Sequence, residues 1–124
     1  MKLSKSEEQL MEIIWSHGKA FMKDLIDSSP DPKPATTTLA TMLKRMQDKG
    51  FVGYTLYGNS REYYPLVKKD DYFAKHMKGI ISNYFGNSSL QFASFFTTKS
   101  NMTKAELEDL KKIIEQEIKR KEKW

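Results

Sequence analysis

The chain contains no cysteine among its 124 residues, which excludes disulfide bonds, thiolate metal sites and cysteine nucleophiles. It has only two histidines, His17 and His76, and neither sits in a clustered metal-ligand spacing. No apolar run approaches the roughly 18 to 20 residues that a membrane span needs, and the N-terminal residues lack the apolar region of a signal peptide. We therefore expect no metal site, no cofactor and a cytoplasmic location.

The sequence also lacks the patterns that support catalysis. It has no nucleophile–base pair, no glycine-rich phosphate loop and no cluster of metal ligands. We predict that the protein is not an enzyme. With 39% hydrophobic and 30% charged residues, it is typical of a globular chain, long enough for one domain or for a small domain with an oligomerisation arm.

Positive charge is distributed unevenly along the chain. Residues 1–32 carry four basic and six acidic side chains, a net charge of −2, whereas residues 33–68 carry six and two, a net charge of +4. The remaining residues, 69–124, have a net charge of +3. A local excess of positive charge suits a polyanion such as nucleic acid.

The stretch from Thr36 to Gly50 predicts an amphipathic helix. Its three threonines favour a helix start, and Lys49 with Gly50 favours a helix end, where a cation meets the last carbonyls and glycine adopts a left-handed conformation. Its apolar residues recur at helical spacing and would face a core: Leu39, Met42, Leu43 and Met46.

The opposite face of this helix carries the candidate DNA-contacting residues. Thr37, Thr41 and Lys44 point away from the apolar stripe, with Thr38 and Arg45 on its margins. Hydroxyl and methyl groups can reach base edges while cations reach phosphates. Considered alone, the helix is equally well interpreted as an ordinary solvated surface helix.

Two helices are predicted before this one. Leu3 to Trp15 has a capping-box pattern at Ser4 and Glu7, and Phe21 to Ser28 forms a second, shorter helix. The prolines between Ser28 and Pro34 end that helix. A short helix, a turn and a basic, threonine-led helix form a helix-turn-helix outline.

A β-hairpin is predicted after the amphipathic helix. Phe51 to Pro65 alternates in polarity around a turn at Gly58-Asn59, with Arg61 at or beside the tip. The order of elements is that of a winged helix, in which the wing lies along the DNA backbone beside the recognition helix. Most of the hairpin tyrosines are expected to pack beneath it: Tyr54, Tyr57, Tyr63 and Tyr64.

The charged run from Lys68 to Asp71 marks the expected boundary between a DNA-binding domain, residues 1–68, and a helical dimerisation domain, residues 69–124. Helices are predicted at Tyr72 to Phe85, at Ser88 to Phe96 and after a capping box at Thr103. These helices have too little chain to close a core, so we expect a two-fold homodimer. The predicted dimerisation residues are Tyr72, Phe73, Met77, Ile80, Ile81, Tyr84, Phe85, Leu107, Leu110, Ile113 and Ile114.

These motifs together resemble the penicillinase and methicillin-resistance repressor family over nearly the whole chain. The resemblance is carried by Ser4 to Trp15, Thr37-Thr38, TMLKRMQDKG from Thr41 to Gly50, Arg61, Tyr63-x-Pro65 and MTKAELEDL from Met102 to Leu110. It implies a homodimeric winged-helix repressor that binds a pseudo-palindromic operator over the promoter of a resistance or stress operon. By the same resemblance, the DNA-binding residues are Thr37, Thr38, Thr41, Lys44, Arg45 and Arg61.

The chain departs from the family pattern in two places. Members controlled by a membrane sensor protease are cut at an Asn-Phe bond, whereas the matching stretch here, Ala93 to Phe96, has no asparagine. A sensor protease acting on the C-terminal region therefore stays an open expectation. The copper-sensing branch uses C-terminal cysteine pairs, which this chain lacks.

Two other functions fit parts of the sequence. In the first, the C-terminal aromatic residues form a ligand pocket in a small-molecule-sensing winged-helix regulator. In the second, the winged helix is a protein-interaction module, and Lys44 and Arg45 face a partner protein. The positive charge of residues 33–68 argues against the second.

Overall fold

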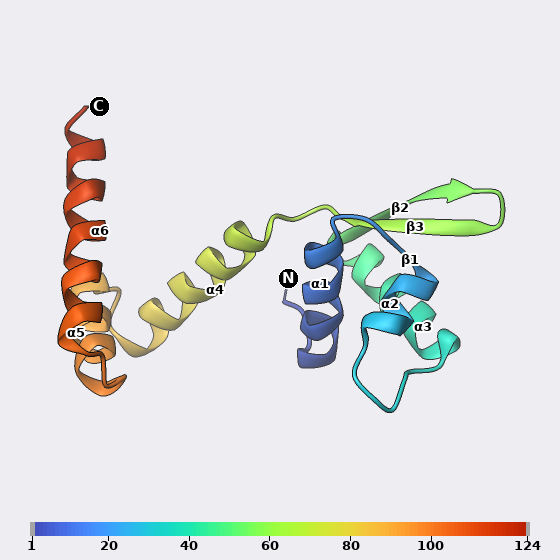
Figure 1. The fold of residues 1–124 in the computed structure, drawn as a ribbon, viewed down its shortest axis with the longest axis horizontal. Coiled ribbons are helices and arrows are strands. Elements are labelled where there is room, and N and C mark those ends of the chain that lie inside the picture. Colours follow the sequence, from blue (N-terminus) through green and yellow to red (C-terminus); the bar gives the residue numbers. More distant parts are fainter. Residues whose placement is uncertain (1, 124) are drawn as a thin grey trace. The chain divides into compact units, whose positions relative to one another are not determined.

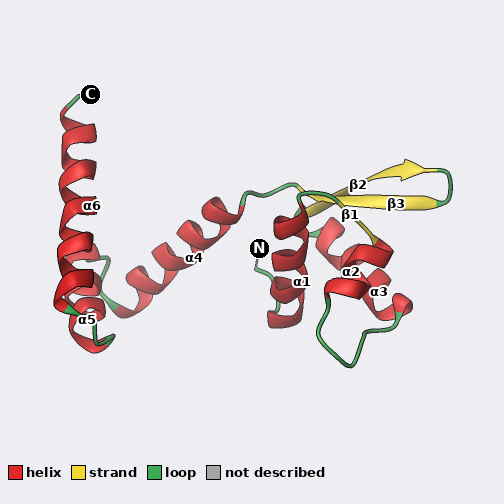
Figure 2. Cartoon of the chain, viewed as in Figure 1, coloured by secondary structure: helices red, strands yellow, loops and turns green. Residues whose placement is uncertain are grey.

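The computed structural model describes residues 2–123, which form two compact units: an N-terminal unit that ends at Ala74 and a C-terminal unit that begins at Lys75. Figure 1 labels the helices and strands, and Figure 2 distinguishes them by colour. The chain is mainly helical with one small sheet, which confirms the predicted fold class. The elements in order are α1 (Lys5–His17), β1 (Ala20–Phe21), α2 (Met22–Ser28), α3 (Thr36–Asp48), β2 (Val52–Tyr57), β3 (Ser60–Pro65), α4 (Lys69–Tyr84), α5 (Ser89–Lys99) and α6 (Lys104–Glu122).

Helix α1 has the capping box that its sequence predicts. The hydroxyl oxygen of Ser4 accepts a hydrogen bond from the backbone N–H of Glu7 at 3.2 Å, and the Glu7 carboxylate accepts one from the Ser4 N–H at 2.8 Å. The helix ends at Gly18, whose φ of 76° is a left-handed angle that suits glycine. Local signals thus fix both ends of α1.

The sheet contains one strand that the sequence pattern did not predict. Its order is β1-β3-β2, and all neighbours are antiparallel. Strand β1 pairs Ala20 with Tyr63 and Phe21 with Glu62. The helix expected from Phe21 therefore begins one residue later. A strand of two residues is too short to show the alternation by which strands are recognised.

The predicted wing is present as strands β2 and β3. Their register runs from Val52 opposite Pro65 to Tyr57 opposite Ser60, which leaves Gly58 and Asn59 in the turn. Gly58 has a φ of 61°, as tight hairpin turns require.

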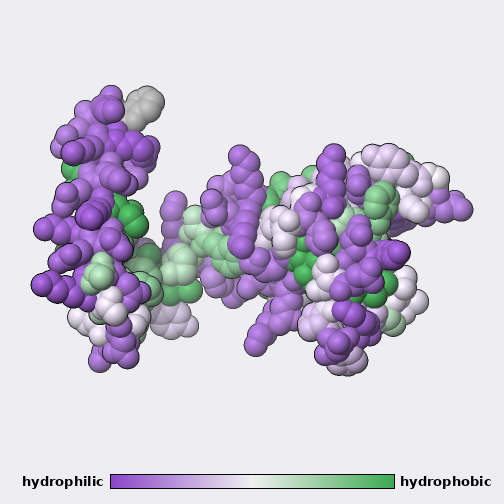
Figure 3. All heavy atoms as spheres, viewed as in Figure 1, coloured by the Kyte–Doolittle hydropathy of each residue, from purple (hydrophilic) through white to green (hydrophobic). Residues whose placement is uncertain are grey.

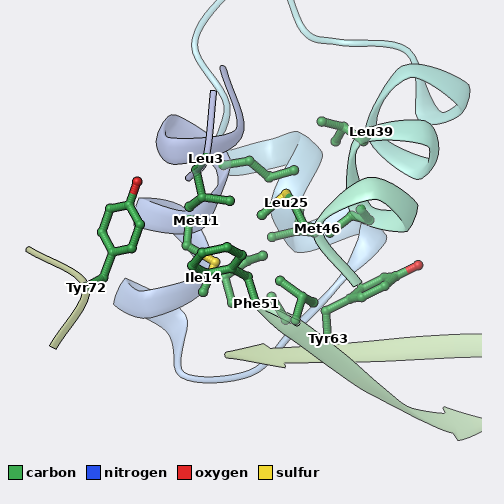
Figure 4. Close-up of a cluster of buried hydrophobic side chains, with 13 residues drawn as sticks. Leu3, Met11, Ile14, Leu25, Leu39, Met46, Phe51, Tyr63 and Tyr72 are labelled. Atoms are coloured by element: carbon green, nitrogen blue, oxygen red, sulfur yellow. The ribbon is translucent and has the colours of Figure 1, made fainter. Parts of the chain in front are cut away.

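The core of the N-terminal unit lies between its helices and the sheet. Met11 and Ile14 from α1, Leu25 from α2 and Met46 from α3 are completely shielded from solvent, and Tyr63 packs from the sheet side (Figure 4). Burial of such side chains stabilises the fold by about 1.5 to 3 kcal/mol each relative to exposure. This core sets the position of α3 relative to the wing.

The first turns of α4 belong to the same core. Tyr72 is only 8% exposed, and its ring packs against Trp15 and Phe51 at centroid distances of 5.8 and 5.6 Å. Its hydroxyl donates a hydrogen bond to Glu8 at 2.9 Å. Burial first, and then the Glu8 carboxylate, raise the pKa of Tyr72. The Trp15 indole N–H donates to the carbonyl of Val67 at 2.9 Å.

These contacts place the end of the compact N-terminal unit inside α4, whereas the sequence placed the domain boundary after Lys68. The same contacts involve two of the residues expected at the dimer interface. Tyr72 is buried against α1, and Phe73 packs beside Trp15 at 5.9 Å. Both side chains pack on the N-terminal core, Tyr72 as a buried residue and Phe73 as a half-buried one.

The C-terminal unit consists of helices whose apolar residues remain open to solvent. None of the described residues from 75 to 123 is buried, and Figure 3 shows hydrophobic residues at the surface of this unit. Phe85 contacts the rings of Phe92 and Phe95 at 5.5 and 5.4 Å. Among the described helices, none has the length and apolar character needed to cross a membrane.

The helix ends in the C-terminal unit follow local signals. Helix α4 stops before Gly86 and Asn87, which both have positive φ. Helix α5 extends to Lys99, beyond the expected end at Phe96. Thr103 and Glu106 form the predicted capping box of α6.

Candidate nucleic-acid interface

Helix α3 presents its apolar stripe to the core and its polar face to solvent. Leu39, Leu43 and Met46 are 4%, 1% and 0% exposed. The five residues that the sequence assigned to DNA contacts all lie on the exposed surface of this helix: Thr37, Thr38, Thr41, Lys44 and Arg45. The helical period places these residues together on one element, as an interface with a groove requires.

Helix α3 begins at Thr36, as the sequence predicts, but without a threonine cap. The N-cap residue is Ala35, and no side chain caps the first turn. The threonines therefore lie inside the helix, where the Thr41 hydroxyl donates to the carbonyl of Thr37 at 2.9 Å. The lone pairs and methyl group of Thr41 stay available to a ligand, while its donor is used within the helix.

Lys44 forms an ion pair on the exposed face of α3. Its ammonium lies 3.0 Å from the carboxylate of Asp48, one turn later, and both side chains are mostly exposed. Pairs of this kind contribute only about 0.2 to 0.5 kcal/mol. A phosphate can therefore displace Asp48 at small cost.

The end of α3 is attached to the start of α1 through a buried ion pair. Lys49 was expected to meet the last carbonyls of its own helix, but its ammonium instead lies 2.6 Å from Glu7, whose side chain is 2% exposed. Burial acts to raise the pKa of Glu7, but hydrogen bonds from Lys49 and Ser4 outweigh it, so the pKa is lowered. The pair holds the last turn of α3 against α1.

The wing carries Arg61 on an exposed position of β3, next to the hairpin tip. Its guanidinium carbon lies 4.4 Å from the centre of the Tyr54 ring, a cation–π geometry. Arg61 forms no salt bridge within the described part of the chain. Its positive charge is therefore not neutralised by a carboxylate of the N-terminal unit.

The hairpin tyrosines differ in environment. Tyr63 is buried, Tyr54 and Tyr64 are half-buried, and Tyr57 is 56% exposed. The sequence pattern predicted that Tyr54 packs beneath the hairpin and gave no indication of its contact with Arg61. The signal that could have found it is the strand alternation, because Tyr54 and Arg61 lie on the same face of the hairpin.

The residues assigned to dimerisation in the C-terminal unit are at most half-buried. Tyr84 is 78% exposed, Ile113 60%, Ile114 51% and Leu107 39%. The others are intermediate: Met77, Ile80, Ile81, Phe85 and Leu110. Further apolar side chains that sequence reasoning did not assign are also exposed: Leu90, Phe95, Phe96 and Ile118.

A helix-turn-helix that packs on a three-stranded sheet, with an exposed polar helix face and a basic wing, defines a winged-helix protein. The solved structure described as the solution structure of the DNA binding domain of the repressor BlaI matches this fold with a TM-score of 0.51 and 28% sequence identity, over 57% of this chain and 88% of that one.

The family model described as "Penicillinase repressor" matches residues 3–116, so the chain belongs to the penicillinase repressor family. It is 25% identical over 114 residues to the methicillin resistance regulatory protein MecI of Staphylococcus aureus (strain N315), covering 91% of this chain and 93% of that protein. It is 22% identical over 121 residues to the penicillinase repressor of Bacillus licheniformis, covering 97% of this chain and 94% of that protein. The family is one of transcriptional repressors and not of enzymes, as the sequence predicts.

Proposed function

We propose that this protein is a DNA-binding transcriptional repressor that acts in the cytoplasm as a homodimer. The observation that carries the proposal is the exposed face of α3, where two cations and three threonines lie together on a helix fixed by the core. The names of its relatives, a methicillin resistance regulator, a penicillinase repressor and the DNA-binding domain of a repressor, support the same function.

In the proposed complex, α3 enters the major groove and the wing contacts the adjacent backbone. Thr37, Thr41 and Thr38 face the base edges, while Lys44 and Arg45 neutralise phosphates. Arg61 adds a cation from the wing. Because most of the affinity then comes from phosphate contacts, binding falls steeply as salt concentration rises.

The C-terminal unit is the proposed dimerisation domain. Its exposed isoleucines and leucines would stay in water in a single copy, which is unfavourable by about 25 cal/mol per Å² of apolar surface. A second copy related by two-fold symmetry covers the apolar side chains of both copies at once. The proposed surface comprises Met77, Ile80, Ile81, Tyr84, Phe85, Leu107, Leu110, Ile113 and Ile114.

A two-fold dimer predicts a pseudo-palindromic operator, with half-sites one helical turn or a multiple of it apart. Occupation of such a site over a promoter excludes the polymerase. The relatives named for methicillin and penicillinase control support a resistance or stress operon as the target. A protease that cuts the C-terminal unit is a further proposed partner, because separating the two copies would release the DNA.

The proposal is tested by selecting duplexes from a random DNA library with the full chain and titrating the selected duplex at several salt concentrations. We expect Lys44→Ala and Arg61→Ala to weaken binding to selected and unrelated duplexes alike and to lower the salt slope by about one each. Thr41→Ala should change which sequence is preferred.

The matched control is Lys112→Ala, which removes the same charge from an exposed position of α6. It should leave the salt slope unchanged. Wild-type affinity and preference in the Lys44, Arg61 and Thr41 variants would refute the assigned interface, and a full chain that binds no duplex would refute the function.

A further inference from the structure

We propose that Tyr54 is a positioning residue for DNA binding, whose ring holds the guanidinium of Arg61 ready to contact the duplex. The proposal rests on the proposed function. It starts from the 4.4 Å separation between the Arg61 guanidinium carbon and the centre of the Tyr54 ring.

The hairpin register brings these two side chains together. Tyr54 pairs with Tyr63, and Leu56 pairs with Arg61. Since alternate residues of a strand share a face, all four side chains lie on one face of the hairpin. Tyr54 and Arg61 are diagonal neighbours on that face, a separation that aromatic and long side chains can span.

Tyr54 is itself connected to the core. Its ring lies 6.0 Å from that of Tyr63 with an interplanar angle of 61°, and Tyr63 is 4% exposed. A continuous series of side-chain contacts therefore runs from the buried core through Tyr63 and Tyr54 to Arg61. These contacts support a side chain that would otherwise sample many rotamers at an exposed strand position.

The contact with Tyr54 also leaves Arg61 able to bind a phosphate. Its guanidinium carbon lies over the ring, and the guanidinium carries five N–H donors in its plane. No salt bridge with a described residue occupies them. A phosphate can accept two such donors at once. Because the side chain is already ordered, binding loses less conformational entropy.

The alternative is that Tyr54 merely stabilises the wing. A double-mutant cycle separates the two roles, because a residue that acts through Arg61 has no effect once Arg61 is removed. The cycle uses Tyr54→Leu, Arg61→Ala and the double variant in the full chain. Tyr54→Phe keeps the ring without its hydroxyl, and Arg61→Lys keeps the charge without the flat guanidinium.

We expect Tyr54→Leu to weaken binding to the selected duplex about three- to fivefold, the size of an exposed cation–π interaction. Tyr54→Phe should bind like the wild type. In the Arg61→Ala background, Tyr54→Leu should have no further effect, and in the Arg61→Lys background only a small one. Equal losses in all backgrounds, or no loss in the wild-type background, would overturn the inference.

The matched control is Tyr57→Leu, which changes the same residue type on the opposite face of β2. It should not be coupled to Arg61→Ala. In the free protein, NMR should show upfield-shifted Arg61 side-chain protons that persist in Tyr54→Phe and return to ordinary values in Tyr54→Leu. Ordinary shifts in the wild type would refute the stacking.

Failure of the inference can be distinguished from failure of the proposed function. If the wild type binds the selected duplex and Arg61→Ala weakens it, the function stands, and the Tyr54 cycle decides the inference alone. If Arg61→Ala has no effect on binding to any duplex, the wing has no such role and both the wing assignment and the inference fail.

Discussion

The two units differ in how they handle apolar surface. In the N-terminal unit, three helices and a sheet enclose side chains from Leu3 to Tyr72 in one core. In the C-terminal unit, α6 has a capping box like that of α1, yet side chains such as Ile113 are 60% exposed. Helices form from local signals, whereas a core requires surfaces that cover one another. The N-terminal unit has those surfaces in one chain, whereas in the proposed dimer a second copy supplies them to the C-terminal unit.

The largest expected effect comes from ending the chain after Ala74. Because the described core of the N-terminal unit and the side chains packed against it extend no further than Phe73, this fragment should fold as a monomer. Its affinity for the operator should fall about 10²- to 10⁴-fold, since two linked binding events become one. Analytical ultracentrifugation and anisotropy titration measure the two effects. A dimeric fragment, or one with full affinity, would show that the C-terminal unit does not hold the two copies together.

The next effect is the loss of core packing in Leu43→Ala. Leu43 is 1% exposed, and a buried truncation of this kind lowers the free energy of unfolding by about 2 to 5 kcal/mol. Leu56→Ala is the matched control, because Leu56 is 57% exposed on the wing. This substitution should change the free energy of unfolding by less than about 0.5 kcal/mol. Urea unfolding of the fragment ending at Ala74 measures both, and similar losses would contradict the assigned core.

A smaller effect is expected for Ile113→Ala in the full chain. If a second copy covers Ile113, the substitution should weaken dimerisation by about 1.5 to 3 kcal/mol and leave the N-terminal unit as stable as before. Sedimentation equilibrium measures the dimer constant. Lys112→Ala, at the neighbouring exposed position, is the control. An unchanged dimer constant would remove Ile113 from the interface.

The smallest effect concerns the ion pair between Glu7 and Lys49. Since the folded state lowers the pKa of Glu7, the carboxylate stabilises the fold above its unfolded pKa, and this contribution is lost as pH falls through the folded value. Glu7→Gln should cost about 1 to 2 kcal/mol at neutral pH and make stability less pH-dependent below about pH 4.5.

Thermal unfolding of the fragment ending at Ala74 between pH 3 and pH 7 tests this pH dependence. Glu12→Gln removes a carboxylate from the exposed pair with Lys69 and should change the profile less. Parallel profiles for wild type and Glu7→Gln would contradict the role of the buried carboxylate.

Much of the fold follows from patterns within a few residues of each other. The capping boxes at Ser4 and Thr103, the period of α3 and the Gly58-Asn59 turn all involve local interactions. Such signals depend on backbone groups that lie close in sequence, so they can be predicted before the tertiary structure is known.

The features that sequence reasoning missed depend on distant partners. Lys49 meets Glu7 across 42 positions, and Trp15 meets Val67 across 52. Strand β1 forms because its backbone pairs with the free edge of β3. Burial of Tyr72 could not be inferred from its own helix, where it continues the same apolar stripe as residues of the C-terminal unit.

The attachment of α4 to α1 has a consequence for how this architecture can be recombined. An exchange of C-terminal units between relatives at the charged run after Val67 would replace Tyr72. The core of the N-terminal unit would then lose the Tyr72 ring. A junction after Ala74 would carry Trp15, Glu8 and Tyr72 together. The segment to transfer as a DNA-binding unit is therefore the winged helix together with the first turns of α4. Chimeric repressors should be joined after Ala74.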